Sequence, residues 1–187
     1  MKIETKRLIL RPLKNSDAKS IVENVNNLSI SKWLLVVPYP YTIKDAKKWI
    51  IDNKEKWSTK KKSEYSFGIG VKKDGKIIGG IGLHKINNEQ GTATIGIWLG
   101  KNYQREGLGS EAFTALLNLA FNKLKLRRVE AGIFVGNPAS PKLMTKFGGK
   151  LEGTKRKSCR SKADNKIHDE MIYGLLKEDW LKAKKRS

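Results

Sequence analysis

The segment Gln-Arg-Glu-Gly-Leu-Gly at residues 104–109 places two glycines where an amphipathic helix has to begin. A glycine inside a helix costs roughly 1 kcal/mol relative to alanine, so the turn must gain something else from them. Residues 92–100 alternate as in a strand, and apolar residues recur at helical spacing through residues 108–124. The turn therefore joins a strand to a helix, which predicts a fold of the mixed α/β class.

The backbone at this turn is a candidate anion site. The first turn of a helix carries unpaired N–H groups and a partial positive charge. Gly107 and Gly109 lack Cβ atoms, so a phosphate could approach the backbone closely. A plain strand-to-helix connection is the alternative interpretation. The chain has no G-x-x-x-x-G-K-[ST] motif, which excludes a P-loop, and no G-x-G-x-x-G after its first strand, which argues against a Rossmann site.

Period-two and helical patterns divide the rest of the chain. Asp74-Gly75 is a hairpin signal inside an antiparallel meander over residues 64–100. In residues 65–71, apolar side chains alternate with small or polar ones, as on a half-buried strand. Asn15 or Ser16 is the expected cap of the first helix, and Thr42 that of the second. The expected strands are residues 3–12, 64–73, 77–85, 92–100, 127–137, 151–160 and 168–176, and the expected helices are 15–25, 43–57, 108–124, 138–149 and the C-terminal tail.

The charge of the chain is strongly positive. It has 39 Lys and Arg against 18 Asp and Glu, a formal net charge of +21. Such a surface attracts phosphates, nucleic acids or acidic proteins. The basic residues are spread along the chain, with a cluster at residues 154–162 and Lys182, Lys184 and Lys185 in the tail. A solvated lysine-rich surface is the alternative, and no nucleic-acid-binding motif is present.

Cysteine and apolar patterning indicate the compartment. Cys159 is the one cysteine, so no internal disulfide can form, which fits a reducing cytoplasm. The chain has no apolar run of transmembrane length, no signal-peptide core and no Cys/His cluster with zinc spacing. We expect one domain over residues 1–187, a cytoplasmic location, and neither a metal nor a membrane partner.

Several blocks resemble the GNAT superfamily of acetyl-CoA-dependent N-acetyltransferases. QREGLG is similar to its Gln/Arg-x-x-Gly-x-Gly/Ala signature and follows the strand IGIWLG, as in that family. NPASPKLMTKFGGKLEG resembles the family's Asn-x-x-Ser helix and the turn after it. ETKRLILRPLKNSDA and HDEMIYGLLKEDW resemble the RimJ/RimL-like branch of ribosomal-protein N-acetyltransferases. The blocks occur in family order and span nearly the whole chain.

This resemblance implies a GNAT fold, with a mostly antiparallel sheet of six to seven strands, flanking helices and a parallel pair that splays apart. Acetyl-CoA would lie in that gap, its pantetheine pairing with the backbone of residues 97–99 and its diphosphate held by the N–H groups of residues 105–110. The residues expected to bind acetyl-CoA are Ile97, Trp98, Leu99, Gln104, Arg105, Glu106, Gly107, Leu108, Gly109, Ser110, Asn137, Ser140, Lys142 and Lys146.

The chemistry needs a neutral amine, a donor for the oxyanion and a proton for the departing thiolate. In many family members a tyrosine seven residues after the Asn supplies that proton, but Met144 stands there. Ser140 matches the serine proposed as the acid in the RimJ/RimL-like branch, and a helix N-cap is its alternative role. Cys159 stands where some members of the branch carry a glutamate base.

His84 and Glu130 are the first candidates for a catalytic base, and Asp169 and His168 are further ones. His84 is preferred, because family strands end beside the acceptor site at that position. An α-amine with a pKa of about 7.7–8.0 is partly neutral at pH 7, whereas a lysine amine with a pKa of about 10.4 is almost fully charged. A site without a clear carboxylate base therefore suits an N-terminal amine.

The sequence thus predicts an N-acetyltransferase that acts by direct attack in a ternary complex, with the N-terminal α-amine of a protein such as a ribosomal protein as acceptor. A small amine (a polyamine, an aminoglycoside or an amino-acid derivative) is the alternative, although a positive surface should repel polycations. A ribosome- or nucleic-acid-binding protein without catalysis is a third interpretation. Ribosome association through the basic surface and a homodimer are further expectations about partners.

Overall fold

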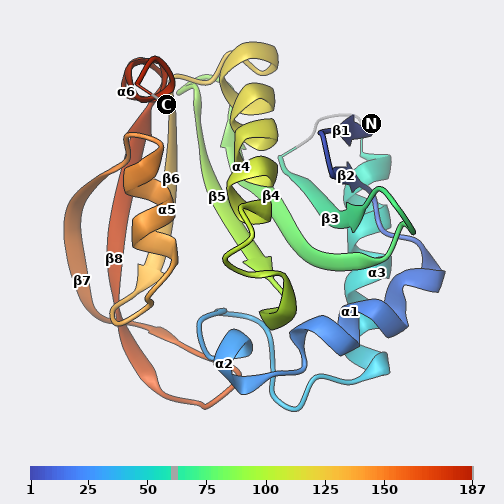
Figure 1. Ribbon diagram of the computed structural model, residues 1–187. Helices are drawn as coiled ribbons and strands as arrows, with labels where there is room; N and C mark the ends of the chain where they lie inside the picture. The colour runs from blue at the N-terminus through green and yellow to red at the C-terminus, as the bar shows by residue number, and fades with distance from the viewer. Residues whose placement is uncertain (60–62, 187) are drawn as a thin grey trace.

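The computed structural model describes residues 1–59 and 63–186, and an eight-stranded sheet runs through this part of the chain (Figure 1). The strands are β1 (Ile3–Glu4), β2 (Leu8–Arg11), β3 (Tyr65–Val71), β4 (Ile77–Asn87), β5 (Thr92–Leu99), β6 (Arg128–Phe134), β7 (Lys150–Arg160) and β8 (Ile167–Leu176). Their order in the sheet is β1-β2-β3-β4-β5-β6-β8-β7. The pair β5–β6 is parallel, and the other neighbours are antiparallel. This arrangement confirms the predicted fold class.

Helices pack on both faces of the sheet. The helices are α1 (Ala18–Val25), α2 (Leu28–Ser31), α3 (Ile43–Ser58), α4 (Leu108–Asn118), α5 (Ser140–Lys146) and α6 (Lys177–Lys184), with 3-10 turns η1 (Asn15–Asp17) and η2 (Lys101–Tyr103) and a π-helical segment η3 (Leu119–Lys123) that continues α4. In Figure 1, α4 and α5 stand in front of the sheet and α3 lies behind it. The predicted cap of α3 is confirmed, because Thr42 N–H donates to Asp45 Oδ2 at 2.8 Å and Asp45 N–H donates to Thr42 Oγ1 at 3.3 Å.

The expected six to seven strands become eight because residues 3–12 do not form one strand. The chain reverses after Glu4, where Thr5 N–H donates to the Leu8 carbonyl at 3.0 Å and Leu8 N–H donates to Thr5 Oγ1 at 2.9 Å. β2 then runs back along β1, with Ile3 opposite Leu10. A threonine hydroxyl therefore closes a turn that the apolar pattern does not reveal.

The expected N-cap of the first helix is also wrong. Instead of an α-helix capped by Asn15 or Ser16, the chain makes the 3-10 turn η1 before α1. The carboxylate of Asp17 causes this start: it accepts the Lys14 N–H at 2.6 Å and forms an ion pair with Arg11 at 2.8 Å. Asp17 is buried, so this pair anchors the turn to β2.

The meander β3–β4–β5 is confirmed, with Asp74-Gly75 in its first turn and Gly75 at φ +73°. The expected half-buried character of residues 65–71 is wrong, because all interior positions of β3 are buried. Phe67 and Ile69 belong to the core beneath α4. On the other face, a Cβ at Gly68 would press against Leu13 and Ile77. The small residues of this strand therefore mark a second packed face.

The parallel pair that positions the site is short. Thr92, Ala93 and Thr94 of β5 pair with residues 128–130 of β6, and the pairing ends there. From Ile95 onwards the two strands separate, as predicted. One edge of each strand therefore faces a gap, and the loops after both strands lie at its open end. No helix within the described residues is long and apolar enough to cross a membrane.

Candidate active site

The β5 edge of the gap presents free backbone groups. Gly100 N–H donates to the Ile78 carbonyl of β4 at 2.8 Å. Because hydrogen-bonding direction alternates along a strand, the backbone groups of Trp98 also point towards β4, and those of Ile97 and Leu99 point into the gap. The Trp98 side chain packs on Trp49 of α3, with ring centroids 6.1 Å apart. An extended ligand could therefore pair with the backbone of Ile97 and with the N–H of Leu99 in the manner of an added strand, whereas the Leu99 carbonyl already accepts a hydrogen bond from Gln104.

The glycine loop (Gln104–Ser110) follows β5 and starts α4. Its first residue is tied back to the strand, because Gln104 Nε2 donates to the Leu99 carbonyl at 3.0 Å. Within the described residues, the backbone N–H groups from Arg105 to Ser110 donate to no acceptor, and the first helical bond is that of Glu111 to the Gly107 carbonyl. A row of unpaired N–H groups at a helix N-terminus is the chemistry that binds phosphate oxygens.

The two glycines of this loop are required for different structural reasons. Gly107 caps α4 in the left-handed region at φ +78°, where a side chain is strained. At Gly109 a Cβ would lie 3.3 Å from Leu99 Cδ1, tighter than ordinary packing. The glycines thus shape the turn and bring α4 close to β5, besides leaving the backbone accessible to a ligand.

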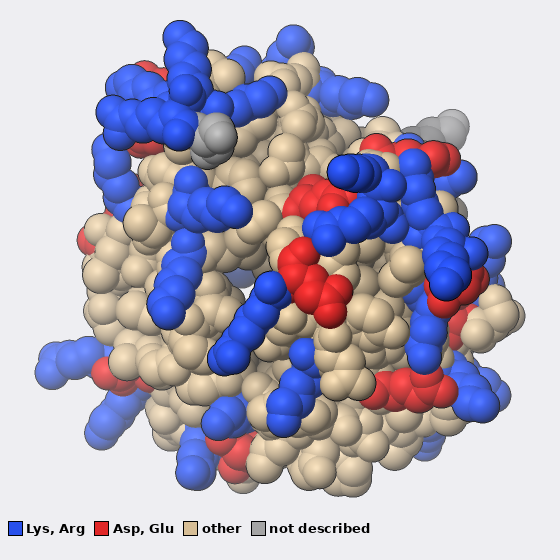
Figure 2. Space-filling view, viewed as in Figure 1, with Lys and Arg blue, Asp and Glu red and all other residues tan. Residues whose placement is uncertain are grey.

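Basic side chains surround the gap. Lys146 Nζ donates to Ser110 Oγ at 3.1 Å, which joins the end of α5 to the first turn of α4. Lys142 is exposed one turn earlier on α5. Figure 2 shows lysine and arginine side chains around a hollow in the region of α4 and α5. A cation beside a helix N-terminus is unfavourable by itself, so this arrangement favours a bound anion.

The loop after β6 orients a second group of candidates. Asn137 Oδ1 accepts the N–H groups of Ala139 and Ser140 at 3.0 and 2.9 Å, so Asn137 closes the turn that leads into α5, whose N-cap is Ala139. The alternative role of Ser140 as an N-cap is therefore wrong, because Ser140 is the first helical residue. Within the described residues, the Asn137 amide NH₂ and the Ser140 hydroxyl have no hydrogen-bond partner. Both groups are available to a ligand.

His84 contacts the ion pair between Glu64 and Lys56. Its Nδ1 lies 2.8 Å from Glu64 Oε2, and Glu64 Oε1 lies 2.8 Å from Lys56 Nζ. Burial raises the pKa of Glu64, but hydrogen bonds from Lys56 and His84 outweigh it and leave that pKa below its usual value. Glu64 was not a sequence candidate. The pairing of Tyr65 with Leu83 brings it beside His84, and sequence reasoning could find this only with the β3–β4 register.

His84, Thr94 and Glu130 occupy one row across β4, β5 and β6. Their side chains therefore share a face of the sheet. The row includes Thr94 and Glu130, the last residues that pair between β5 and β6 before the two strands separate. Arg128 binds the Glu130 carboxylate at 2.7 Å and also forms an ion pair with Glu152. The side chains of His84 and Glu130 are each 41% exposed. The Glu130 carboxylate is held by Arg128, whereas His84 is oriented through Nδ1 and its Nε2 has no hydrogen-bond partner within the described residues.

The remaining candidates lie away from this row. Asp169 accepts a backbone N–H from β7 at 2.7 Å, and His168 stacks on Phe134 with ring centroids 4.5 Å apart. Cys159 lies opposite His168 on β7, which β8 separates from β6. Met144, at the family's tyrosine position, is 2% exposed and belongs to the core. The described residues contain no group of three or more His, Cys, Asp or Glu that could hold a metal ion.

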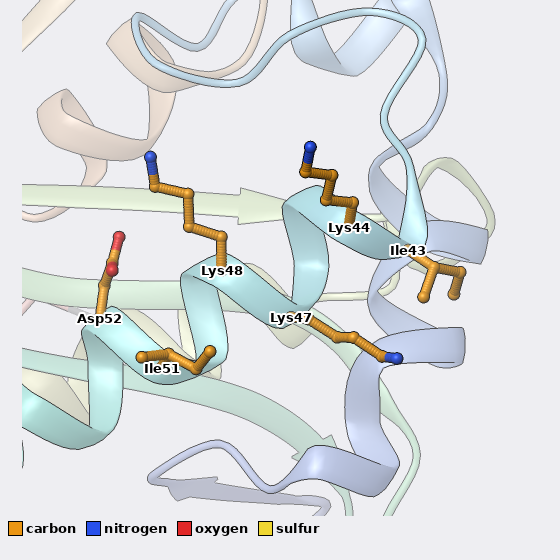
Figure 3. A pocket seen from close by; sticks show the side chains of 6 residues that line it. All are labelled: Ile43, Lys44, Lys47, Lys48, Ile51 and Asp52. Atoms are coloured by element: carbon orange, nitrogen blue, oxygen red, sulfur yellow. The ribbon is translucent and has the colours of Figure 1, made fainter.

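Two other hollows contain none of the candidate residues. One of about 520 Å³ lies on the outer face of α3, and one of about 970 Å³ lies beside β2 and α1. In Figure 3, Lys44 and Lys48 point upwards from α3 and Lys47 extends to the right. The first hollow is lined by Ile43, Lys44, Lys47, Lys48, Ile51 and Asp52. It lies on a helix surface and includes none of the candidate residues, so the candidate chemistry remains at the gap.

Comparison with known proteins agrees with this geometry. Residues 7–150 match the model of the acetyltransferase (GNAT) domain. The uncharacterized N-acetyltransferase YnaD of Bacillus subtilis (strain 168) is 32% identical over 180 residues, covering 96% of this chain and 99% of its own. The ribosomal-protein-serine acetyltransferase of Escherichia coli (strain K12) is 35% identical over 81 residues, 43% of this chain and 45% of its own. The crystal structure of a GNAT-family acetyltransferase from Bacillus anthracis is similar with a TM-score of 0.80 and 26% identity, covering 95% and 99% of the two chains. The chain belongs to the GNAT family and is an acetyl-CoA-dependent N-acetyltransferase.

Proposed function

We propose that the chain transfers the acetyl group of acetyl-CoA to the N-terminal α-amine of a protein, with ribosomal proteins as the acceptor class. The observation that carries this proposal is the row beside the gap. Its carboxylate, Glu130, is bound by the Arg128 cation, whereas the imidazole of His84 has a second nitrogen, Nε2, with no hydrogen-bond partner within the described residues, and this nitrogen can act as a base. Such a base suits an amine with a pKa of about 7.7–8.0 better than a lysine amine with a pKa of about 10.4. The similarity to the E. coli ribosomal-protein-serine acetyltransferase also supports it.

The groups at the gap fit acetyl-CoA, which supplies an activated thioester. The unpaired N–H groups from Arg105 to Ser110 would hold the diphosphate, with Lys142 and Lys146 beside its phosphates. The backbone of Ile97 and the amide of Asn137 would bind the pantetheine arm. This assignment needs no side chain to leave the hydrogen bonds it makes within the protein, apart from Lys146.

The reaction would proceed by direct attack. The amine nitrogen forms a bond to the acetyl carbon, the carbon–sulfur bond breaks, and the acetyl group never resides on the protein. His84 takes the proton that the amine loses, directly or through a water. Ser140 gives its hydroxyl proton to the thiolate and is reprotonated by solvent. Glu64 would hold the His84 ring in place through Nδ1, which leaves Nε2 to accept the proton.

Replacing Ser140 with alanine is expected to lower kcat by about 10- to 100-fold and to leave the Kd of acetyl-CoA within about twofold of wild type. The hydroxyl would serve the departing thiolate and not the bound cofactor. Steady-state kinetics together with calorimetry separate the two effects, and Ser158→Ala on exposed β7 is the matched control. An unchanged kcat in Ser140→Ala would exclude this role.

The acceptor class is tested by release of free CoA thiol from acetyl-CoA. The acceptors are peptides with free Ala or Ser N-termini, the same peptides with blocked N-termini, spermidine and an aminoglycoside. Turnover limited to the free N-termini is the expected result. Turnover limited to spermidine or the aminoglycoside would replace the proposal with small-amine acetylation on the same fold.

Ribosome association through the basic surface, and with it a cytoplasmic location, belongs to the same proposal. Lys182 and Lys184 lie on α6 and Lys185 follows it, with Lys184 Nζ 5.6 Å from the Trp180 ring centroid. Replacing the three lysines with alanine is expected to weaken co-sedimentation with ribosomes. The slope of the log–log salt dependence should flatten by about 0.7–0.9 for each phosphate that the variant no longer neutralises. Co-sedimentation equal to wild type at every salt concentration would contradict this role of the tail.

A further inference from the structure

The turn between β1 and β2 (Thr5–Leu8) is built around a carboxylate of α4. Glu111, in the first turn of that helix, accepts three hydrogen bonds from this turn: Thr5 Oγ1 at 2.6 Å, Arg7 N–H at 2.7 Å and Arg7 Nε at 2.7 Å. Burial raises the pKa of Glu111, but these hydrogen bonds outweigh it and leave that pKa below its usual value. The carboxylate is therefore ionised at neutral pH, and it ties the N-terminal turn to the start of α4.

Arg7 also forms a hydrogen bond to the glycine loop on the N-terminal side of Gly107. Its Nη1 donates to the Glu106 carbonyl at 3.0 Å. Glu106 precedes Gly107, the left-handed N-cap of α4, and Glu111 follows it. One guanidinium therefore binds the chain on both sides of Gly107. The conformation of the loop exposes its N–H groups, and Arg7 supplies two side-chain bonds that hold this conformation from outside.

The remaining nitrogen of the guanidinium is free. Nη2 makes no hydrogen bond within the described residues, and it lies 3.5 Å from the position that a Cβ of Gly107 would take. The Arg7 side chain is 45% exposed. Nη2 therefore presents two N–H donors at the helix N-terminus, beside the unpaired backbone N–H groups. A guanidinium held in this way matches the geometry of phosphate oxygens.

We propose that Arg7 is a positioning residue for the acetyl-CoA diphosphate: it braces the glycine loop through Glu106 and Glu111 and offers Nη2 to a phosphate oxygen. This role rests on the proposed binding of the diphosphate by the loop. It gives the N-terminal segment Thr5–Leu8 a function in cofactor binding, although nearly a hundred residues separate it in sequence from the loop it holds.

The test compares two acetyl donors, acetyl-CoA and S-acetylpantetheine, which lacks the diphosphate. In Arg7→Ala, the KM for acetyl-CoA and the Kd for CoA are expected to rise about 10- to 100-fold, with kcat within about threefold of wild type. The KM for S-acetylpantetheine should not change, because this donor has no phosphate for Arg7 to bind. Arg7→Lys keeps the positive charge but loses the planar set of guanidinium donors, so a smaller rise in the KM for acetyl-CoA than in Arg7→Ala is expected. Lys6→Ala, an exposed neighbour, is the control for removal of one positive charge and should behave as wild type.

Wild-type KM values for acetyl-CoA in Arg7→Ala would overturn the inference, and so would equal losses with both donors, since those indicate a general structural role. If Arg7→Ala does not fold by thermal melting, Glu111→Gln replaces it, with a smaller rise in KM for acetyl-CoA alone as the expected result. Failure of the wild type to bind CoA would overturn the cofactor assignment of the loop and this inference with it. If the wild type binds CoA and the variants bind it equally well, the role of Arg7 alone would be overturned.

Discussion

Gly107→Glu is expected to raise the Kd of acetyl-CoA by about 1,000-fold or more, equivalent to about 4 kcal/mol. The new carboxylate would stand at the N-terminus of α4, where the diphosphate is proposed to bind, and it would repel the phosphates and occupy their place. The cost of the substitution to folding is small by comparison, because a non-glycine residue at φ +78° loses about 1–2 kcal/mol. Isothermal titration calorimetry with acetyl-CoA measures the effect.

Gly75→Glu is the matched control for this substitution. Gly75 has φ +73°, nearly the value at Gly107, and a Cβ there meets nothing within 4 Å. The same side chain therefore meets the same backbone strain in the β3–β4 turn, away from the glycine loop. Gly75→Glu should bind acetyl-CoA as wild type does. Binding by Gly107→Glu within about threefold of wild type would contradict the assignment of the diphosphate to this loop.

His84→Ala is expected to lower kcat by about 100-fold or more, with little change in the Kd of acetyl-CoA. The variant removes the group proposed to take the proton from the attacking amine. Glu64→Gln keeps a side chain of the same shape beside Nδ1 but removes its charge, so a smaller fall in kcat is expected. Pre-steady-state kinetics with a free-N-terminus peptide separate proton transfer from product release.

The pH dependence adds a second readout for this pair. The pKa of Glu64 lies below its usual value of 4.5, so the carboxylate is ionised above pH 4.5. The hold of Glu64 on the His84 ring is therefore lost only as the pH falls through the lowered pKa. Any acidic limb of kcat/KM above pH 5 therefore belongs to a group other than Glu64. Glu130→Gln tests the competing base. A large loss in Glu130→Gln combined with wild-type rates in His84→Ala would assign the proton transfer to Glu130.

The parts of this molecule that sequence reasoning could predict are encoded by short patterns. The glycine loop, the alternation of β3, β4 and β5, and the Thr42 cap each depend on residues within a few positions of one another. The splayed pair could be expected from the resemblance to the GNAT family, and its three paired rungs confirm it. Local spacing and a family motif therefore suffice for the strand–loop–helix unit that forms the gap.

The parts that could not be predicted depend on partners distant in sequence. Glu64 meets His84 because β3 and β4 pair in one register, and Arg7 meets Glu111 because β2 lies beside α4. Neither contact produces a periodic pattern in the sequence. The burial of both faces of β3 could not be predicted for a related reason, because glycine alternation looks the same whether the small residues face solvent or a second packed helix layer.

The most direct test of the proposed function is the position of the acetyl group on one acceptor that offers both kinds of amine. A peptide with a free N-terminal serine or alanine and one internal lysine is incubated with the protein and acetyl-CoA, and tandem mass spectrometry locates the added acetyl group. The proposal predicts a single acetyl group on the α-amine. Acetylation of the lysine side chain, or an unmodified peptide under conditions in which spermidine is acetylated, would contradict it.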